Sequence, residues 1–170
     1  MAKRVINIEL STKSIEKAIR EIREYQQSFK VKLNTFLERL GSLGIQVIDN
    51  NIPTGEDDPS PEHYAYMKVN SYDGYAEGTL YLQGEDILFI EFGAGIAFSA
   101  IQHPKASEMG YGVGTYPGQT HAYDEEGWWY TAEDGTRRHS RGNFAHMPLY
   151  KAETEIISSI QTIAREVFGS

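Results

Sequence analysis

The sequence of 170 residues contains no cysteine, which excludes disulfide bonds, thiolate metal sites and cysteine nucleophiles. It also lacks any apolar run that approaches the roughly 18 residues needed to span a membrane. The first residues, Met1–Arg4, lead into a short strand-like segment rather than a signal-peptide core. We therefore expect a protein that works in a cytoplasm, or in a particle assembled there, with no membrane partner.

Basic residues are in the minority, because 16 Lys and Arg stand against 24 Asp and Glu, for a net charge of −8. An acidic field repels a phosphate backbone unless a local basic patch overrides it. The densest basic run, Arg137–Arg141, holds three arginines and lies close to acidic residues. We expect no specific nucleic-acid partner.

What the chain does contain is typical of one globular domain spanning residues 1–170. Hydrophobic residues make up 40% of the sequence and charged residues 24%, which is ordinary for a folded protein. A chain of this length buries roughly two-thirds of the surface that it exposes when unfolded.

The N-terminal third predicts a short strand followed by a long helix. Val5–Leu10 alternates between apolar and polar residues, as a strand does, and Ser11 or Thr12 can cap a following helix. Between Lys13 and Leu40, apolar residues recur every three or four positions, which indicates an amphipathic helix. Gly41 is expected to end this helix. Such a helix is about 42 Å long. This length favours a helix that overhangs its own core or packs against another subunit.

A break and a three-stranded meander are expected next. Leu43–Ile48 could be a last helical segment or a strand, and Gly41 and Gly44 favour a break here. Residues 49–61 are rich in turn-forming residues. Three segments then have strand character, with turns expected at Asp73-Gly74 and Gly84-Glu85: Tyr64–Ser71, Tyr75–Gln83 and Asp86–Phe92. Short turns between strands predict an antiparallel sheet.

Residues 93–147 differ in character from the rest of the chain. They hold nine of the 16 glycines, both tryptophans and four of the five histidines. This composition predicts a long insertion with the weakest order of the chain, containing a hairpin around Trp128–Tyr130 and Asp134-Gly135.

A second helix should begin at Pro148, since proline favours the first helical turn, and should end at Gly169. The predicted fold class is therefore α+β. An antiparallel β-sheet is packed by a long N-terminal helix and a C-terminal helix, with a long Gly- and aromatic-rich insertion.

The insertion offers side chains for a metal site, although none has a spacing that places ligands in advance. They are His103, His121, His139 and His146, with Asp124, Glu125 and Glu126. Histidines scattered over a Gly-rich loop are more often surface or hydrogen-bonding residues. We expect no metal and no other cofactor, and keep a metal-dependent hydrolase as the alternative function.

Other catalytic patterns fail on spacing or context. No serine lies in a G-x-S-x-G elbow, and the adjacency of His139 and Ser140 does not indicate a triad. Gly110–Gly114 lacks the strand, helix and lysine of a phosphate loop. Neighbouring acids, such as Glu125-Glu126 and Asp57-Asp58, are normally just solvated. We therefore expect no catalytic residues and a protein that is not an enzyme.

Aromatic residues suggest an interface instead. Trp128 and Trp129 are adjacent, so in a strand one would anchor the insertion and the other would face outward. Exposed aromatic side chains often carry much of the binding energy of an interface. The residues predicted to form such an interface are Trp128, Trp129, Tyr130, Phe144, Met147 and Phe92.

Two segments carry a resemblance to a known family. Ile90–Gly95 reads Ile-Glu-Phe-Gly-Ala-Gly, and Gly142–Ala152 is a Gly/Pro-containing approach, with a Phe and a Met, into the last helix. Together they resemble the neck and minor tail-component family of tailed bacteriophages and prophages. Two departures are Ala94, where the family usually has threonine, and Ile52–Gly55, which matches the family's Pro-x-x-Thr-Gly turn only in part.

The resemblance implies a structural protein of virion assembly rather than an enzyme. Such proteins act at the head–tail connector or tail end as ring-type homo-oligomers that also contact neighbouring neck or tail proteins. An acidic surface suits a component beside a DNA passage. A small acidic inhibitor or immunity-type binding module is a further alternative.

Overall fold

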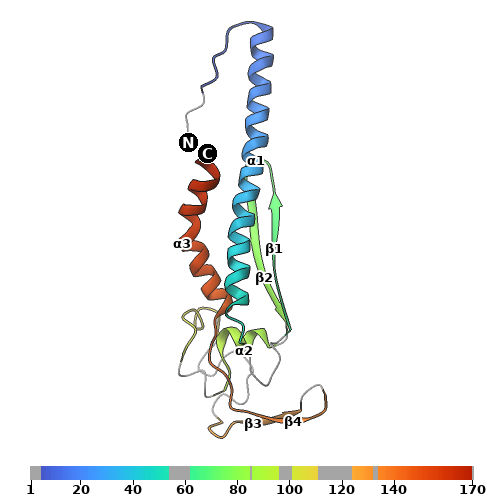
Figure 1. Ribbon diagram of the computed structural model, residues 1–170, viewed down its shortest axis with the longest axis vertical. Helices are drawn as coiled ribbons and strands as arrows, with labels where there is room; N and C mark the ends of the chain where they lie inside the picture. Colours follow the sequence, from blue (N-terminus) through green and yellow to red (C-terminus); the bar gives the residue numbers. More distant parts are fainter. Residues whose placement is uncertain are drawn as a thin grey trace.

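The computed structural model describes residues 5–53, 62–84, 86–95, 101–110, 124–131 and 134–169. Figure 1 shows a long N-terminal helix, two small antiparallel sheets and a C-terminal helix, which confirms the α+β class. The elements are α1 (Thr12–Asp49), β1 (His63–Ser71), β2 (Ala76–Gly84), α2 (Ile87–Phe92), β3 (Trp128–Thr131), β4 (Arg137–Ser140) and α3 (Pro148–Phe168).

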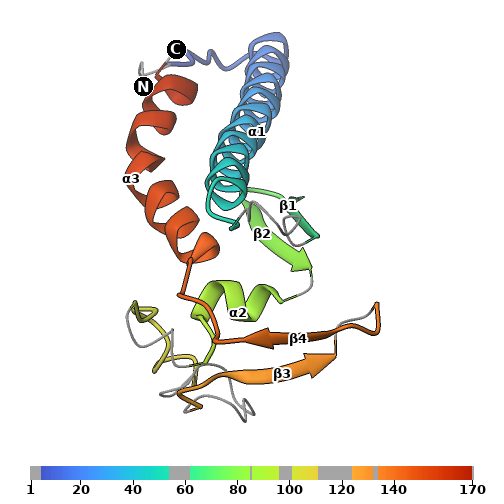
Figure 2. The ribbon, with the colours of Figure 1, turned by 60° about the horizontal axis from the view of Figure 1, so that its bottom comes forward.

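The helix α1 is the middle layer of the molecule, with α3 on one side and the β1–β2 hairpin on the other (Figures 1 and 2). α2 lies at the end of α1, beside the start of α3. The hydrophobic core lies where these elements meet, and its buried members are Ile48, Ile52, Ile87, Ile90 and Ala152.

The chain before α1 is not the strand that was predicted for Val5–Leu10. Within the described ranges, strands pair only as β1 with β2 and β3 with β4, so this segment has no strand beside it to form a ladder with. The predicted cap is confirmed at Ser11, whose side chain accepts a hydrogen bond from the Ser14 backbone N–H at 3.3 Å.

The predicted end of the first helix at Gly41 is wrong, and so is the break at Gly44, because α1 continues to Asp49. Both glycines are buried within the helix. A Cβ added at Gly41 would lie 1.9 Å from Met67 Sδ on β1. A Cβ at Gly44 would lie 2.8 Å from both Ile156 Cδ1 of α3 and Leu80 Cδ2 of β2. The glycines therefore allow close packing of neighbouring elements rather than ending the helix.

The β1–β2 hairpin confirms the first two strands of the predicted meander. The strands pair in register from His63↔Gly84 to Ser71↔Ala76. The turn at Asp73-Gly74 is also as predicted, with Gly74 at a φ of +89°, a conformation that favours glycine.

The third predicted strand, Asp86–Phe92, is wrong, because this segment forms α2. Ile87, Ile90 and Glu91 are buried while Leu88 is exposed, which is the three-to-four spacing of a helix. A short apolar run with a single charged residue, Glu91, does not distinguish the helical period from the strand period, so its sequence fits both structures.

The later elements agree with the sequence. β3 and β4 form the predicted hairpin around Trp128–Tyr130, and α3 begins at Pro148 and ends before Gly169. Parts of the predicted loop at 49–61 and of the insertion at 93–147, including the glycine run from 111, lie outside the described residues. None of the helices in the described ranges combines the length and apolar character needed to cross a membrane.

Gly41→Ala should destabilise the protein, although alanine normally favours an exposed helix interior by about 1 kcal/mol. The added methyl group overlaps Met67, whose Cε already lies where a Cβ of Gly78 would be, so the side chain cannot retreat in that direction. We expect a loss of about 1–3 kcal/mol in the free energy of unfolding, measured by urea denaturation. In a Met67→Ala background the same change should cost much less. Equal costs in both backgrounds would contradict the packing role of Gly41.

Candidate functional site

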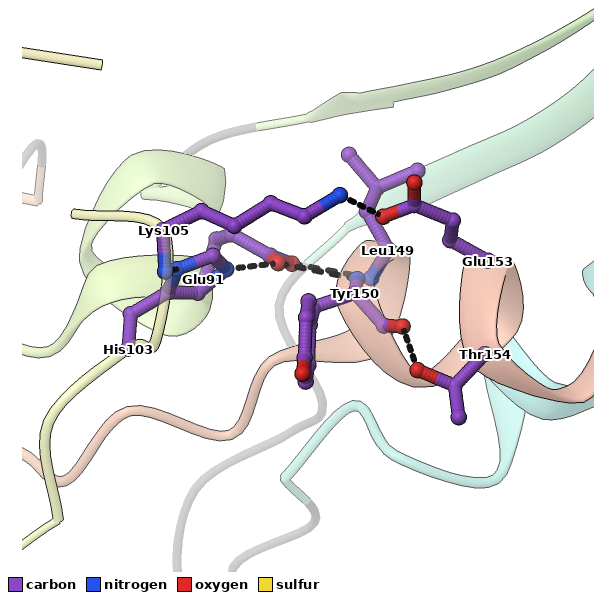
Figure 3. Close-up of polar contacts among 7 residues, drawn as sticks. All are labelled: Glu91, His103, Lys105, Leu149, Tyr150, Glu153 and Thr154. Carbon is purple, nitrogen blue, oxygen red and sulfur yellow. Dashed lines mark hydrogen bonds and ion pairs between the residues drawn. The ribbon is translucent and has the colours of Figure 1, made fainter. Parts of the chain in front are cut away.

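The most concentrated polar chemistry in the described chain surrounds the buried carboxylate of Glu91, which is 4% exposed. Figure 3 shows this carboxylate at the N-terminus of α3. Its Oε2 accepts a hydrogen bond from the Leu149 backbone N–H at 2.8 Å, and its Oε1 accepts one from the Tyr150 N–H at 3.0 Å. The first turn of α3 holds no acidic residue of its own, so Glu91 supplies the negative charge that a helix N-terminus favours.

The third partner of Glu91 is His103, which is 6% exposed. His103 Nε2 lies 2.9 Å from Glu91 Oε1, and the Lys105 backbone N–H donates to His103 Nδ1 at 3.1 Å. A ring nitrogen that accepts a hydrogen bond carries no proton, so the geometry assigns the neutral tautomer with its proton on Nε2. His103 therefore donates to the Glu91 carboxylate.

Further hydrogen bonds join the end of α2 to residues 143–146, which precede α3. The His146 N–H donates to the Ile90 carbonyl at 2.8 Å, and the Asn143 side-chain amide donates to the Phe89 carbonyl at 2.8 Å. Ala94 and Asn143 exchange two backbone hydrogen bonds of 2.9 and 3.0 Å. The last carbonyls of α2 and the first N–H groups of α3 are thus satisfied reciprocally.

The cluster resembles a catalytic carboxylate–histidine pair, but its polar atoms are all occupied. Both nitrogens of His103 and both oxygens of Glu91 have partners within the chain. A general base needs a nitrogen within reach of a substrate proton. In this geometry the cluster positions α3, and each nitrogen of His103 already has a partner within the chain.

An apolar groove of about 710 Å³ opens beside the cluster, between α2, α3 and residues 101–110. Its charged rim includes Lys105 and Glu153, which form an ion pair. The Glu153 carboxylate raises the pKa of Lys105 above its ordinary value. The apolar side chains that line the groove are Leu80, Ile87, Leu88, Phe92, Met109, Leu149, Ile156 and Ile157.

The residues predicted to form an interface are divided between the surface and the core. Trp129 is 61% exposed, and Tyr130 and Phe144 are also exposed. Phe92 and Met147 are buried, and Met147 holds the left-handed turn before α3 with a φ of 56°. The structure therefore keeps Trp129, Tyr130 and Phe144 available to a partner, while their role in binding stays a prediction.

The neighbouring tryptophans differ as expected for adjacent residues of a strand. Trp128 is partly buried against Gly95, where an added Cβ would lie 2.7 Å from Trp128 Cζ3. Trp129 packs on the surface between His139, with ring centroids 5.0 Å apart, and the guanidinium of Arg137, which lies 5.6 Å from the ring.

Within the described ranges, no three His, Asp or Glu side chains gather closely enough to hold a metal ion. His121, one of the histidines considered from the sequence, lies outside those ranges. His103 is engaged with Glu91, and the His139 ring contacts Trp129 at a tilt of 57°.

The sequence had not indicated the capping role of Glu91 or its pairing with His103. One signal was present, because a lone charged residue in the apolar run Ile87–Phe92 is rarely buried without partners. Comparison of the chain with protein-family models, with curated proteins and with solved structures found no match.

Glu91→Gln should lower the free energy of unfolding by about 1–3 kcal/mol, because an amide retains only one acceptor oxygen and removes the charge. Either the Leu149 or the Tyr150 backbone N–H would then lose its acceptor beside the buried residue 91. The measurement is urea unfolding followed by circular dichroism. Glu153→Gln is the matched control, since its ion pair with Lys105 is partly exposed and should contribute little to stability. Equal losses for the two variants would contradict the capping role.

His146 should make stability depend on pH. Partial burial, with the Lys151 ammonium nearby, lowers the pKa of His146 below its ordinary value of 6.5. The unfolded chain therefore binds a proton at a higher pH than the folded chain does. The stabilising contribution is complete above about pH 6.5 and is lost as the pH falls through that value towards the folded pKa.

The test compares urea unfolding of the native protein with that of His146→Gln between pH 8 and pH 5. The native protein should lose more stability on acidification than the variant, which has no titrating group at this position. Parallel losses in the two proteins would show that His146 does not contribute.

Proposed function

We propose that this protein is a structural morphogenesis protein of a tailed phage or prophage. It acts at the head–tail neck or tail end through self-association and binding to neighbouring virion proteins. The proposal begins from the resemblance of Ile90–Gly95 and Gly142–Ala152 to the phage family. These two segments lie against each other, joined by the Ala94–Asn143 bridge and by the Glu91 cap of α3.

The observation that carries the proposal is the apolar surface left uncovered at both ends of the molecule. At one end, the first half of α1 extends beyond α3 with Ile15, Ile19 and Ile22 exposed (Figure 1). At the other end, Trp129 and Phe144 are exposed near the β3–β4 hairpin. Large exposed apolar patches mark interaction sites in proteins. A subunit with such surfaces suits an assembly whose copies and neighbours cover them.

The chemistry of the described residues supports a structural role over the hydrolase alternative. The Glu91–His103 pair is buried and fully engaged in holding α3. The molecular mass of the protein in solution distinguishes the proposal from the alternative of a monomeric binding module. Self-association in solution favours the assembly protein.

Deletion of the gene from a strain that produces particles tests the proposal directly. A neck or tail-end component is needed to complete particles, so we expect filled heads and detached tails by electron microscopy, and a large loss of infectious titre. Supplying the native gene in trans should restore complete particles. Complete, infectious particles from the deletion strain would overturn the proposal.

A further inference from the structure

The first half of α1 has an apolar stripe that nothing in the described chain covers fully. α3 packs along the second half of α1 and ends at Phe168, whose ring lies 5.8 Å from that of Phe29. Beyond this contact, Ile15, Ile19 and Ile22 are each 44–45% exposed. We call residues 12–28 the arm, and Figure 1 shows it projecting past the end of α3.

The spacing of the stripe is that of a helix that binds another surface. Ile15, Ile19 and Ile22 are separated by four and three positions, so they lie on one side of the helix. The same spacing continues through Phe29 and Phe36, where Phe168 of α3 covers it. In the arm Ala18 is buried, but the three isoleucines remain 44–45% exposed, so the arm repeats, only partly covered, the pattern that binds α3 in the other half of α1.

Charge is distributed unequally between the arm end, by which we mean residues 1–32, and the rest of the chain. The arm itself, residues 12–28, holds four Lys and Arg and three Glu. Residues 1–32 hold eight Lys and Arg and four Glu, a formal charge of +4. Residues 33–170 hold eight Lys and Arg and 20 Asp and Glu, a formal charge of −12. The arm end of one copy is therefore attracted to the body of another, whereas two arm ends repel each other.

The groove between α2 and α3 offers the body a matching surface. Its side chains include Leu88, Met109 and Ile157, which are 47%, 59% and 61% exposed. Its rim carries the Glu153 carboxylate paired with Lys105. An open apolar groove accepts the three- and four-spaced side chains of an amphipathic helix.

We propose that the arm of one copy docks in this groove of a second copy, with Ile15, Ile19 and Ile22 against Leu88 and Ile157. The inference rests on the proposed function, because that function requires copies to associate. It adds which two surfaces make the contact. The two surfaces differ, so the contact is head-to-tail, and repetition of such a contact closes a ring or extends a filament. Repulsion between basic arm ends disfavours the alternative of paired arms.

The absence of cysteine allows a direct test by disulfide cross-linking. Ile19→Cys and Ile157→Cys are prepared as separate proteins; both positions are exposed, so the fold should be unchanged and is checked by circular dichroism. The two proteins are mixed and oxidised, and the linked peptides are identified by mass spectrometry. Lys17→Cys replaces Ile19→Cys in the control, because position 17 lies about 200° around the helix from position 19.

Docking predicts that the Ile19→Cys/Ile157→Cys pair forms the dominant cross-link and that the Lys17→Cys/Ile157→Cys pair forms at least several-fold less. The yield should fall as salt is raised, because charge attraction contributes. Cross-links mainly between two Ile19→Cys chains would overturn the inference in favour of paired arms.

Light scattering of the native protein separates failure of this inference from failure of the proposed function. Association without the predicted cross-link would overturn the groove as the docking surface and leave self-association intact. A protein that stays monomeric at every concentration and forms no cross-link would overturn the docking itself. The proposed role in virions is judged independently, by the particles from the deletion strain.

Discussion

The Glu91 carboxylate fixes the arrangement of the half of the molecule where α1 ends and α3 begins. α3 starts after Met147, which has a left-handed backbone and no side-chain acceptor for the first N–H groups. Those groups are buried, and an unpaired buried N–H costs about as much as a lost hydrogen bond. Glu91, which is 58 positions before Leu149, supplies the acceptors. The buried charge is tolerated because His103 and two backbone N–H groups surround it.

The same clamp determines where the β3–β4 hairpin is attached. Ala94, just after α2, and Asn143, just before α3, pair with each other. Gly142 is required at this crossing, since its φ is +85° and an added Cβ would lie 1.9 Å from the Ala94 carbonyl oxygen. The β3–β4 hairpin lies on the far side of α2 from α1 (Figure 2), and its Trp129 is exposed. A segment attached in this way can carry surface residues without disturbing the packing of α1 and α3.

The sequence predicted those parts of the fold that depend on local signals. Ser11 as a cap, the turn at Asp73-Gly74 and the start of α3 at Pro148 each follow from the preferences of a few neighbouring residues. The predictions of a helix end at Gly41 and of a strand at Ile87–Phe92 were wrong, because segments distant in the sequence form the surroundings of these residues. Gly41 continues a helix since β1 packs against it, and the apolar run becomes a helix whose last carbonyls are satisfied by residues 143–146. The Glu91–His103 cluster was missed for the same reason, because no spacing in the sequence joins its partners.

The rigidity of α1 connects the clamp to the proposed assembly. A single continuous helix runs from the arm to Ile48 in the core, so the arm has a fixed direction relative to the body. The groove is equally fixed, because α2 and α3, which form its walls, are tied by Glu91. The geometry between an arm and a groove within one copy is then set by packed helices rather than by loops. In a head-to-tail assembly this geometry sets the rotation from one copy to the next, which decides whether a chain of copies closes. In the proposed assembly, the buried polar cluster therefore holds the receiving surface at a constant angle to the arm.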